Sequence, residues 1–249
     1  MGLSQARRPE RLAERAASAS FVACISDYTR SQAMAFVPEE LWPKLLVVRC
    51  GVDLREFAPQ RPRHGCELRL LTVGRIDAMK GTVLLLQAVS QLRARGLRPV
   101  LTIVGEGPSR TKAAAIADRL GIGEQVTWAG AVGQDRIAEF YASRDVFCLP
   151  SFAEGVPISL IVAMAMALPV VASAIAGIAE LVEDGVSGLL VRPGRVDQLT
   201  DRLARLLEDP ALRHSMGREG RRTVAREYDL HRNARLLADL FVADARTGK

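Results

Sequence analysis

Residues 147–173 read FCLPSFAEGVPISLIVAMAMALPVVAS, and this stretch decides the fold. An apolar strand leads into a turn with one acidic residue, and a helix and a second apolar strand follow. In an open parallel sheet, ligands bind beyond the carboxyl ends of the strands, where the next helix points unpaired N–H groups into the crevice. The turn at 154–157 is therefore predicted to bind a ligand and to favour an anion.

The residues of this turn suit that role. Gly155 lets a ligand approach the backbone closely, and Pro157 is tolerated in the first turn of a helix. The Glu154 carboxylate can hold sugar hydroxyls. The alternative is that Glu154 only complements the helix dipole, and this segment alone does not choose between the two.

The same region has no charged residue from Val156 to Ala179, which is long enough to raise the question of a membrane span. Pro169 interrupts this run, with a helical pattern before it and the β-branched Val170 and Val171 after it. The flanking residues are acidic, with no Lys or Arg cluster to set an orientation. The pattern therefore predicts a helix, a turn and a strand rather than a span.

Composition sets wider limits. The chain has 249 residues, of which 49% are hydrophobic and 25% charged, as expected of a folded globular protein. Its net charge of +6 comes from arginines on the predicted helices. These attract phosphates, nucleic acid or an anionic membrane surface, unless they form a solvated helix face. Aromatic residues make up only 5% and do not interleave with basic stretches, so no nucleic-acid partner is expected.

Cysteine, histidine and the N-terminus point to a cytoplasmic protein without a metal site. Four cysteines form no C-x-x-C pair and are expected to be reduced: Cys24, Cys50, Cys66 and Cys148. The three histidines lack metal-ligand spacing. The N-terminus is polar and Arg-rich, so no signal peptide is expected.

Short apolar strands alternate with helical patterns along the chain. The predicted strands are Phe21–Ile25, Leu45–Val48, Leu68–Val73, Val100–Val104, Gln125–Trp128, Val146–Leu149, Val170–Ala172 and Gly188–Val191. The predicted helices are Thr82–Arg95, Arg110–Leu120, Asp135–Ala142, Ile158–Ala167 and Ile178–Val182, and the chain is predicted to be helical from Gln198 onward. Such alternation predicts an α/β fold with a doubly wound parallel sheet. Pro and Gly residues near 60–65 place a boundary there, which divides the chain into 1–60, 61–197 and 198–249.

A second turn carries cations. Gly74 and Arg75 follow the third predicted strand, and Lys80 and Gly81 stand where the next helix starts. A helix N-terminus disfavours positive charge by about 0.3–1 kcal/mol, so Arg75 and Lys80 fit best around a bound diphosphate. The alternative is that both side chains point into solvent. The G-E-G-P turn at 105–108 lacks the third glycine of a dinucleotide fingerprint and is weak evidence by itself.

Taken in order, these segments resemble the retaining glycosyltransferases of family 4, also called glycosyl transferases group 1, over about residues 21–241. The matching segments are V-x-x-G-V-D-x-x-x-F-x-P at 48–59, G-R-x-x-x-x-K-G at 74–81, G-E-G-P at 105–108, L-P-S-x-x-E-G-V-P at 149–157, A-M-A-M-A-L-P-V-V-A-S at 163–173 and G-I-A-E-L-V-E-D-G-V-S-G-L-L-V at 177–191. The resemblance implies the GT-B fold of two facing Rossmann-like lobes, of which this chain would supply the C-terminal, donor-binding lobe.

The resemblance also implies roles for single residues. Arg75 and Lys80, in the turn that begins at Gly74, would neutralise the donor diphosphate and stabilise the leaving nucleotide, so no metal or other cofactor is implied. Glu154 would contact the donor sugar. The backbone after it would face the sugar and phosphates, through Gly155, Val156, Pro157 and Ile158. The nucleophile would be the acceptor hydroxyl, with retention of configuration.

Two departures from the family pattern stand out. The second Glu of the family's E-x7-E motif, assigned to the ribose hydroxyls, is replaced here by Val162. Loss of a charge-assisted hydrogen bond worth about 1.5–3 kcal/mol predicts donor binding weaker by roughly 10- to 100-fold, unless another group compensates. In addition, residues 1–60 match only the end of the family's N-terminal lobe. That lobe binds the acceptor and usually supplies a catalytic His, and we expect it to be largely missing.

The sequence therefore predicts a hexosyltransferase of polysaccharide biosynthesis, with a nucleotide sugar as donor and a saccharide or lipid-linked glycan as acceptor. We expect it in the cytoplasm, including the inner face of the membrane, working with a separate acceptor-binding chain or as a homo-oligomer. The alternative is a truncated or decayed donor-binding lobe that acts as a nucleotide-binding or interaction module. Val162 and the missing lobe favour this alternative, whereas Arg75, Lys80 and Glu154 favour the enzyme.

Overall fold

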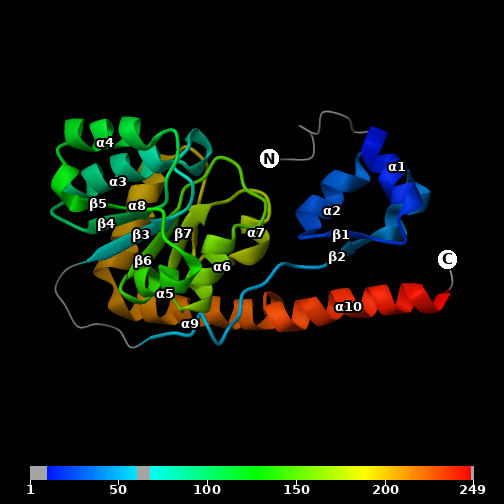
Figure 1. The fold of residues 1–249 in the computed structure, drawn as a ribbon. Helices are drawn as coiled ribbons and strands as arrows, with labels where there is room; N and C mark the ends of the chain where they lie inside the picture. Colours follow the sequence, from blue (N-terminus) through cyan, green and yellow to red (C-terminus); the bar gives the residue numbers. More distant parts are fainter. Residues whose placement is uncertain (1–9, 61–67, 248–249) are drawn as a thin grey trace.

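The computed structural model describes residues 10–60 and 68–247. Its main body is a six-stranded sheet in the order β5-β4-β3-β6-β7-β8, in which every ladder is parallel (Figure 1). The strands are β3 (Arg69–Val73), β4 (Val100–Val104), β5 (Val126–Gly130), β6 (Val146–Leu149), β7 (Val170–Ser173) and β8 (Leu189–Val191). The winding reverses between β3 and β6, as in a Rossmann sheet. The predicted doubly wound parallel sheet is confirmed.

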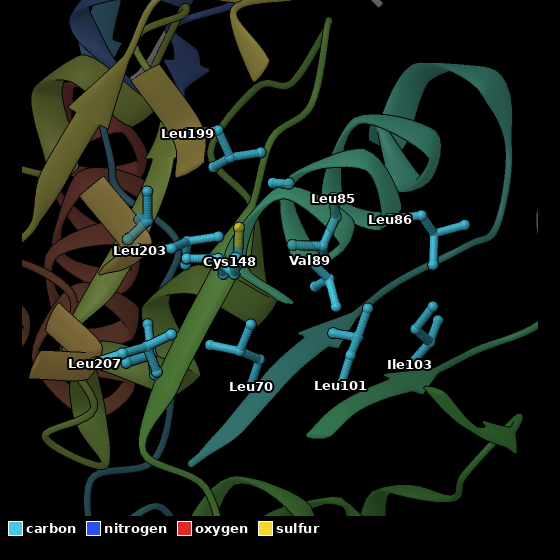
Figure 2. Close-up of a cluster of buried hydrophobic side chains, with 14 of the residues drawn as sticks. Leu70, Leu85, Leu86, Val89, Leu101, Ile103, Cys148, Leu199, Leu203 and Leu207 are labelled. Atoms are coloured by element: carbon cyan, nitrogen blue, oxygen red, sulfur yellow. The ribbon is translucent and has the colours of Figure 1, made fainter. Parts of the chain in front are cut away.

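Helices cover both faces of this sheet (Figure 1). One face carries α3 (Thr82–Ala94), α4 (Arg110–Arg119) and α8 (Val196–Glu208), and the other carries α5 (Gln134–Ala142), α6 (Ile158–Ala165) and α7 (Ile178–Leu181). Helix α9 (Pro210–Glu227) contributes Met216 to the first core and Val224 to the second. Leu70 and Leu71 of β3 belong to opposite cores because successive side chains on a strand point to opposite faces. Figure 2 shows the first core, where Leu70 and Cys148 from the sheet pack near Val89 of α3 and Leu203 of α8.

Residues 10–48 form a smaller unit beside the main sheet (Figure 1). Strands β1 (Val22–Cys24) and β2 (Leu45–Val47) pair in parallel as a separate two-stranded sheet. Around them lie α1 (Glu10–Ser18), α2 (Asp27–Met34) and the 3-10 helix η2 (Glu39–Lys44). Both predicted strands of this region are therefore confirmed, and the helices between them were not predicted.

The last helix, α10 (Leu230–Thr247), continues past the main body and runs along the smaller unit (Figure 1). The rings of Phe241 on α10 and Phe21 lie edge to face, with centroids 5.0 Å apart. Among the described side chains of α10, the large apolar ones that are exposed are Leu230, Leu236, Phe241 and Val242. The last helix therefore keeps large apolar side chains in contact with solvent.

One carboxylate joins the smaller unit to the main body. Glu180 of α7 accepts hydrogen bonds from the backbone N–H groups of Asp27 (2.9 Å) and Tyr28 (2.5 Å), which begin α2. Arg49 adds ion pairs to Asp27 at 3.1 Å and to Glu227 at 3.8 Å. The start of α2 is thereby fixed beside the carboxyl edge of the main sheet.

The predicted helix Ile158–Ala167 ends at Ala165 instead. Ala167 has φ 56°, a left-handed conformation that cannot continue a right-handed helix. Pro169 then begins the path into β7. The predicted boundary near 60–65 falls mostly on residues 61–67, outside the described residues, so the division at 1–60, 61–197 and 198–249 stays a prediction.

Candidate ligand-binding site

The candidate site lies where the winding of the sheet reverses. The turns after β3 (residues 74–81) and after β6 (residues 150–157) meet at this edge, where the N–H of Phe152 donates to the carbonyl of Met79 at 2.7 Å. Gly81 has φ 66°, and a Cβ at this position would come within 2.0 Å of the Pro150 carbonyl oxygen. Only glycine permits both this conformation and this approach. The two turns are therefore held together through Gly81.

Lys80 and Glu154, which the sequence assigned to separate roles, contact each other here. Lys80 Nζ is 2.7 Å from Glu154 Oε1, and Ser151 Oγ lies 2.7 Å from the same oxygen. The side chain of Glu154 is 8% exposed and that of Lys80 25%. An isolated carboxylate so deeply buried would be unfavourable, and the ammonium group compensates its charge.

Arg75 lies at the outer edge of the site, with its side chain 71% exposed and its Nε 3.7 Å from Asp77 Oδ2. Among the described contacts, none joins Arg75 to Lys80 or Glu154. Asp77 also accepts from the backbone N–H groups of Met79 (2.9 Å) and Lys80 (3.2 Å), so it caps the 3-10 helix η3 (Ala78–Lys80). Asp77 therefore fixes the backbone from which Lys80 projects.

The G-E-G-P turn at residues 105–108, which was weak evidence in the sequence alone, packs against the cationic turn at residues 74–81. Gly105 has φ 132°, and a Cβ there would lie 2.0 Å from the carbonyl oxygen of Gly74. The N–H of Ile76 donates a hydrogen bond to the Glu106 carbonyl at 2.9 Å, and the N–H of Ser109 donates one to the Ile76 carbonyl at 3.0 Å. This turn thus supports residues 74–76, and close packing against Gly74 requires its first glycine.

The predicted anion-binding turn leads into α6 as expected. Pro157 stands at the N-cap, one position before the helix, and no side chain of the described residues caps this helix end. Val156 is buried and Ile158 is exposed. Gly155 faces the smaller unit, because a Cβ there would touch Ile25 at 3.4 Å. The unpaired N–H groups of this helix end are suited to an anion.

Val162 lies one turn further along α6. Its side chain is 5% exposed and belongs to the second hydrophobic core. The carboxylate that the resemblance implies for the ribose is therefore replaced here by a valine that contributes to packing.

A cavity of about 290 Å³ separates the site from the smaller unit. Glu154 and Gly155 line one side of it, and the other side is formed by α1, β1 and α2: Leu12, Val22, Ala23, Cys24, Ile25, Tyr28, Thr29, Gln32 and Ala33. The carboxylate of Glu154 thus lies between the turn at residues 74–81 and a largely apolar cavity.

Two features are absent from residues 10–60 and 68–247. No cluster of three or more His, Cys, Asp or Glu side chains is arranged to hold a metal ion. No helix has both the length and the apolar character needed to cross a membrane.

A doubly wound sheet with a glycine-rich cationic turn and an uncapped helix end at its winding reversal defines a Rossmann-like class of fold. The family model of glycosyl transferases group 1 matches residues 55–223. The chain belongs to this family.

Individual relatives agree with this assignment. An alpha-D-kanosaminyltransferase of Streptomyces kanamyceticus is 32% identical over 74% of this chain and 48% of its own length. A GDP-mannose-dependent alpha-(1-6)-phosphatidylinositol monomannoside mannosyltransferase of Mycobacterium tuberculosis H37Rv is 32% identical over 90% of this chain and 62% of its own. The chain thus spans roughly half the length of the curated relatives it matches.

Solved structures show the same fold. Sucrose-phosphate synthase from Thermosynechococcus elongatus superposes with a TM-score of 0.87 at 26% identity, covering 100% of this chain and 64% of that one. The Anabaena protein HepE, in complex with UDP-glucose, superposes with a TM-score of 0.83 at 20% identity, covering 96% of this chain and 69% of that one. The six-stranded sheet is therefore a Rossmann-like unit of the GT-B type.

Proposed function

We propose that this chain is the C-terminal, donor-binding lobe of a retaining glycosyltransferase that transfers a hexose from a nucleoside diphosphate sugar. The observation that carries this proposal is the Lys80–Glu154 pair at the winding reversal, with its 2.7 Å contact, beside the uncapped start of α6. A cation, a carboxylate and free N–H groups at one edge match the two halves of such a donor, its phosphates and its sugar. Named relatives that transfer kanosamine and mannose, and HepE with UDP-glucose, support the donor class.

In the proposed complex, the diphosphate lies between Lys80, Arg75 and the N–H groups that begin α6. These groups stabilise the charge that develops as the nucleoside diphosphate departs, and no metal is required for that neutralisation. Arg75 reaches the ligand from the solvent side, because its side chain is 71% exposed and its described ion pair with Asp77 is long, at 3.7 Å. Glu154 accepts hydrogen bonds from sugar hydroxyls.

The reaction breaks the bond between the anomeric carbon and the diphosphate oxygen, which leaves with the electron pair. The acceptor hydroxyl attacks the anomeric carbon from the same face, forms the new glycosidic bond and passes its proton to the departing diphosphate. The configuration of the sugar is therefore retained. The side chains of this lobe act on the leaving group, and positioning of the acceptor belongs to a facing lobe.

We propose that this facing lobe comes from a separate acceptor-binding chain or a second copy, and that it presents a saccharide or lipid-linked acceptor at the cytoplasmic face of the membrane. Holding two reactants in one cleft can supply about 7–11 kcal/mol of the barrier reduction. Exposed apolar side chains of α10 and the cavity beside β1 offer a surface for such a lobe. A dilute, monomeric preparation should then transfer sugar far more slowly than the assembled enzyme, as a radiolabelled transfer assay would show.

Calorimetric titration tests the donor site. Nucleoside diphosphate should bind and the matching nucleoside should not, and Arg75→Ala or Lys80→Ala should weaken the binding several-fold. Arg195→Ala is a matched control, since Arg195 is also exposed and pairs with the Asp two positions later. Equal binding of nucleoside and diphosphate by the wild-type chain would refute the proposal.

A further inference from the structure

Ser151 makes a contact that the donor site does not need for phosphate binding. It lies two residues after β6 and is 0% exposed, and its Oγ is 2.7 Å from Glu154 Oε1. Lys80 Nζ approaches the same oxygen, also at 2.7 Å. Both described hydrogen bonds of the carboxylate therefore end on Oε1, which leaves Oε2 for other partners.

The two donors differ in what a ligand does to them. Lys80 carries a charge and is partly exposed, so a bound diphosphate competes with Glu154 for its ammonium group. Ser151 is neutral and fully enclosed, so its hydroxyl stays on the carboxylate whether or not phosphate is present. When Lys80 turns to the diphosphate, Ser151 is the side chain that still fixes the orientation of Glu154.

We infer that Ser151 is a positioning residue for sugar recognition, which holds Glu154 Oε1 so that Oε2 faces the hydroxyls of the donor sugar. This inference rests on the proposed function, because it assigns the sugar contact to Glu154. It predicts a division of labour in which Lys80 governs affinity for the diphosphate and Ser151 governs the extra affinity contributed by the sugar.

A matched control is available on the next strand. Ser173 ends β7 and is 1% exposed, and its Oγ has no hydrogen-bond partner among the described residues. Ser151→Ala and Ser173→Ala thus remove the same atom from equally buried sites. Only the first removal takes a hydrogen bond from Glu154.

The test compares two ligands by calorimetry on the full chain: UDP with UDP-glucose, and GDP with GDP-mannose. Ser151→Ala should lower the affinity for the nucleotide sugar by about 2- to 10-fold, the equivalent of one hydrogen bond, and change the affinity for the diphosphate less than twofold. Ser173→Ala should change neither affinity. If Ser151→Ala does not fold, the nearly isosteric Ser151→Cys is tested instead. Because a thiol is a weaker donor than a hydroxyl, Ser151→Cys should lower the ratio of the affinity for the nucleotide sugar to the affinity for the diphosphate.

The possible outcomes distinguish a failure of the proposed function from a failure of the role assigned to Ser151. A wild-type chain that binds no nucleotide refutes the proposed function and this inference with it. A wild-type chain that binds the diphosphate, with an affinity ratio unchanged in Ser151→Ala, overturns only the role of Ser151. Equal losses for both ligands, or the same loss in Ser173→Ala, show that Ser151 matters for packing alone.

Discussion

Gly81→Ala tests the contact that brings the two turns of the site together. Gly81 joins η3 to α3, and its φ of 66° is left-handed. An alanine in this conformation costs about 1–2 kcal/mol. Its Cβ would also stand 2.0 Å from the Pro150 carbonyl oxygen, so the backbone must shift, at a further cost of about 1–3 kcal/mol. The expected loss in the free energy of unfolding is about 2–5 kcal/mol.

Gly96→Ala is the matched control, because Gly96 follows the other end of α3. Its φ of 86° is also left-handed, and a Cβ there would meet nothing within 4 Å. Gly96→Ala therefore isolates the backbone term, about 1–2 kcal/mol. Urea denaturation of both variants gives the difference that is due to close packing against Pro150.

Binding supplies the second measurement for the same pair of variants. Displacing the backbone at Gly81 separates Lys80 from Glu154, so Gly81→Ala should weaken the binding of nucleoside diphosphate, whereas Gly96→Ala should leave it unchanged. Equal destabilisation by the two substitutions would refute the packing argument. Unchanged binding by a destabilised Gly81→Ala would show that the approach of the turns does not shape the site.

Three further changes test other contacts. Val162→Glu would place a carboxylate in the second core, so unfolding measurements should show a loss of about 2–5 kcal/mol; unchanged stability with tighter donor binding would show instead that position 162 reaches the ribose. Glu180→Ala removes the acceptor for two N–H groups of α2, so hydrogen exchange at residues 27–28 should accelerate, and the exposed Glu183→Ala should leave it unchanged. Burial raises the pKa of the Tyr141 hydroxyl, so the unfolded chain ionises first and stability should fall above about pH 10. Thermal melts of Tyr141→Phe should recover about 1.4 kcal/mol of that loss at pH 11, and identical pH profiles would contradict this.

The strands of the main sheet were predictable because each is a short apolar run between turn signals. Val100–Val104 and Val146–Leu149 match the prediction at both ends. The end of α6 was not predictable from the sequence. Ala167 takes a left-handed conformation there, and such a conformation is usually marked by Gly or Asn rather than by alanine. Its conformation is imposed by packing, and Gly217 approaches so closely that a Cβ would lie 2.0 Å from the Ala167 carbonyl oxygen.

Within the site, the individual residues were predictable and their partners were not. Lys80 and Glu154 stand out by residue type and place in their turns, but they are 74 positions apart. Their pairing depends on the crossing of the two turns at Gly81. Glu180 meets residues 27–28 across more than 150 positions, and nothing local marks it as a capping residue for α2. Sequence patterns therefore identify which groups are chemically suited to a ligand, whereas packing decides which of them touch.

The pairing of Lys80 with Glu154 has a consequence for ligand choice. At 2.7 Å and an effective dielectric constant of about 20, the Coulomb attraction is about 6 kcal/mol before desolvation is subtracted. A ligand that offers only phosphates draws Lys80 away and leaves a carboxylate that is 8% exposed with Ser151 as its remaining described donor. A ligand that also brings hydroxyl donors restores what the carboxylate loses. Under the proposed function, the site therefore discriminates in favour of the nucleotide sugar over the free nucleotide, which is the direction that product release requires.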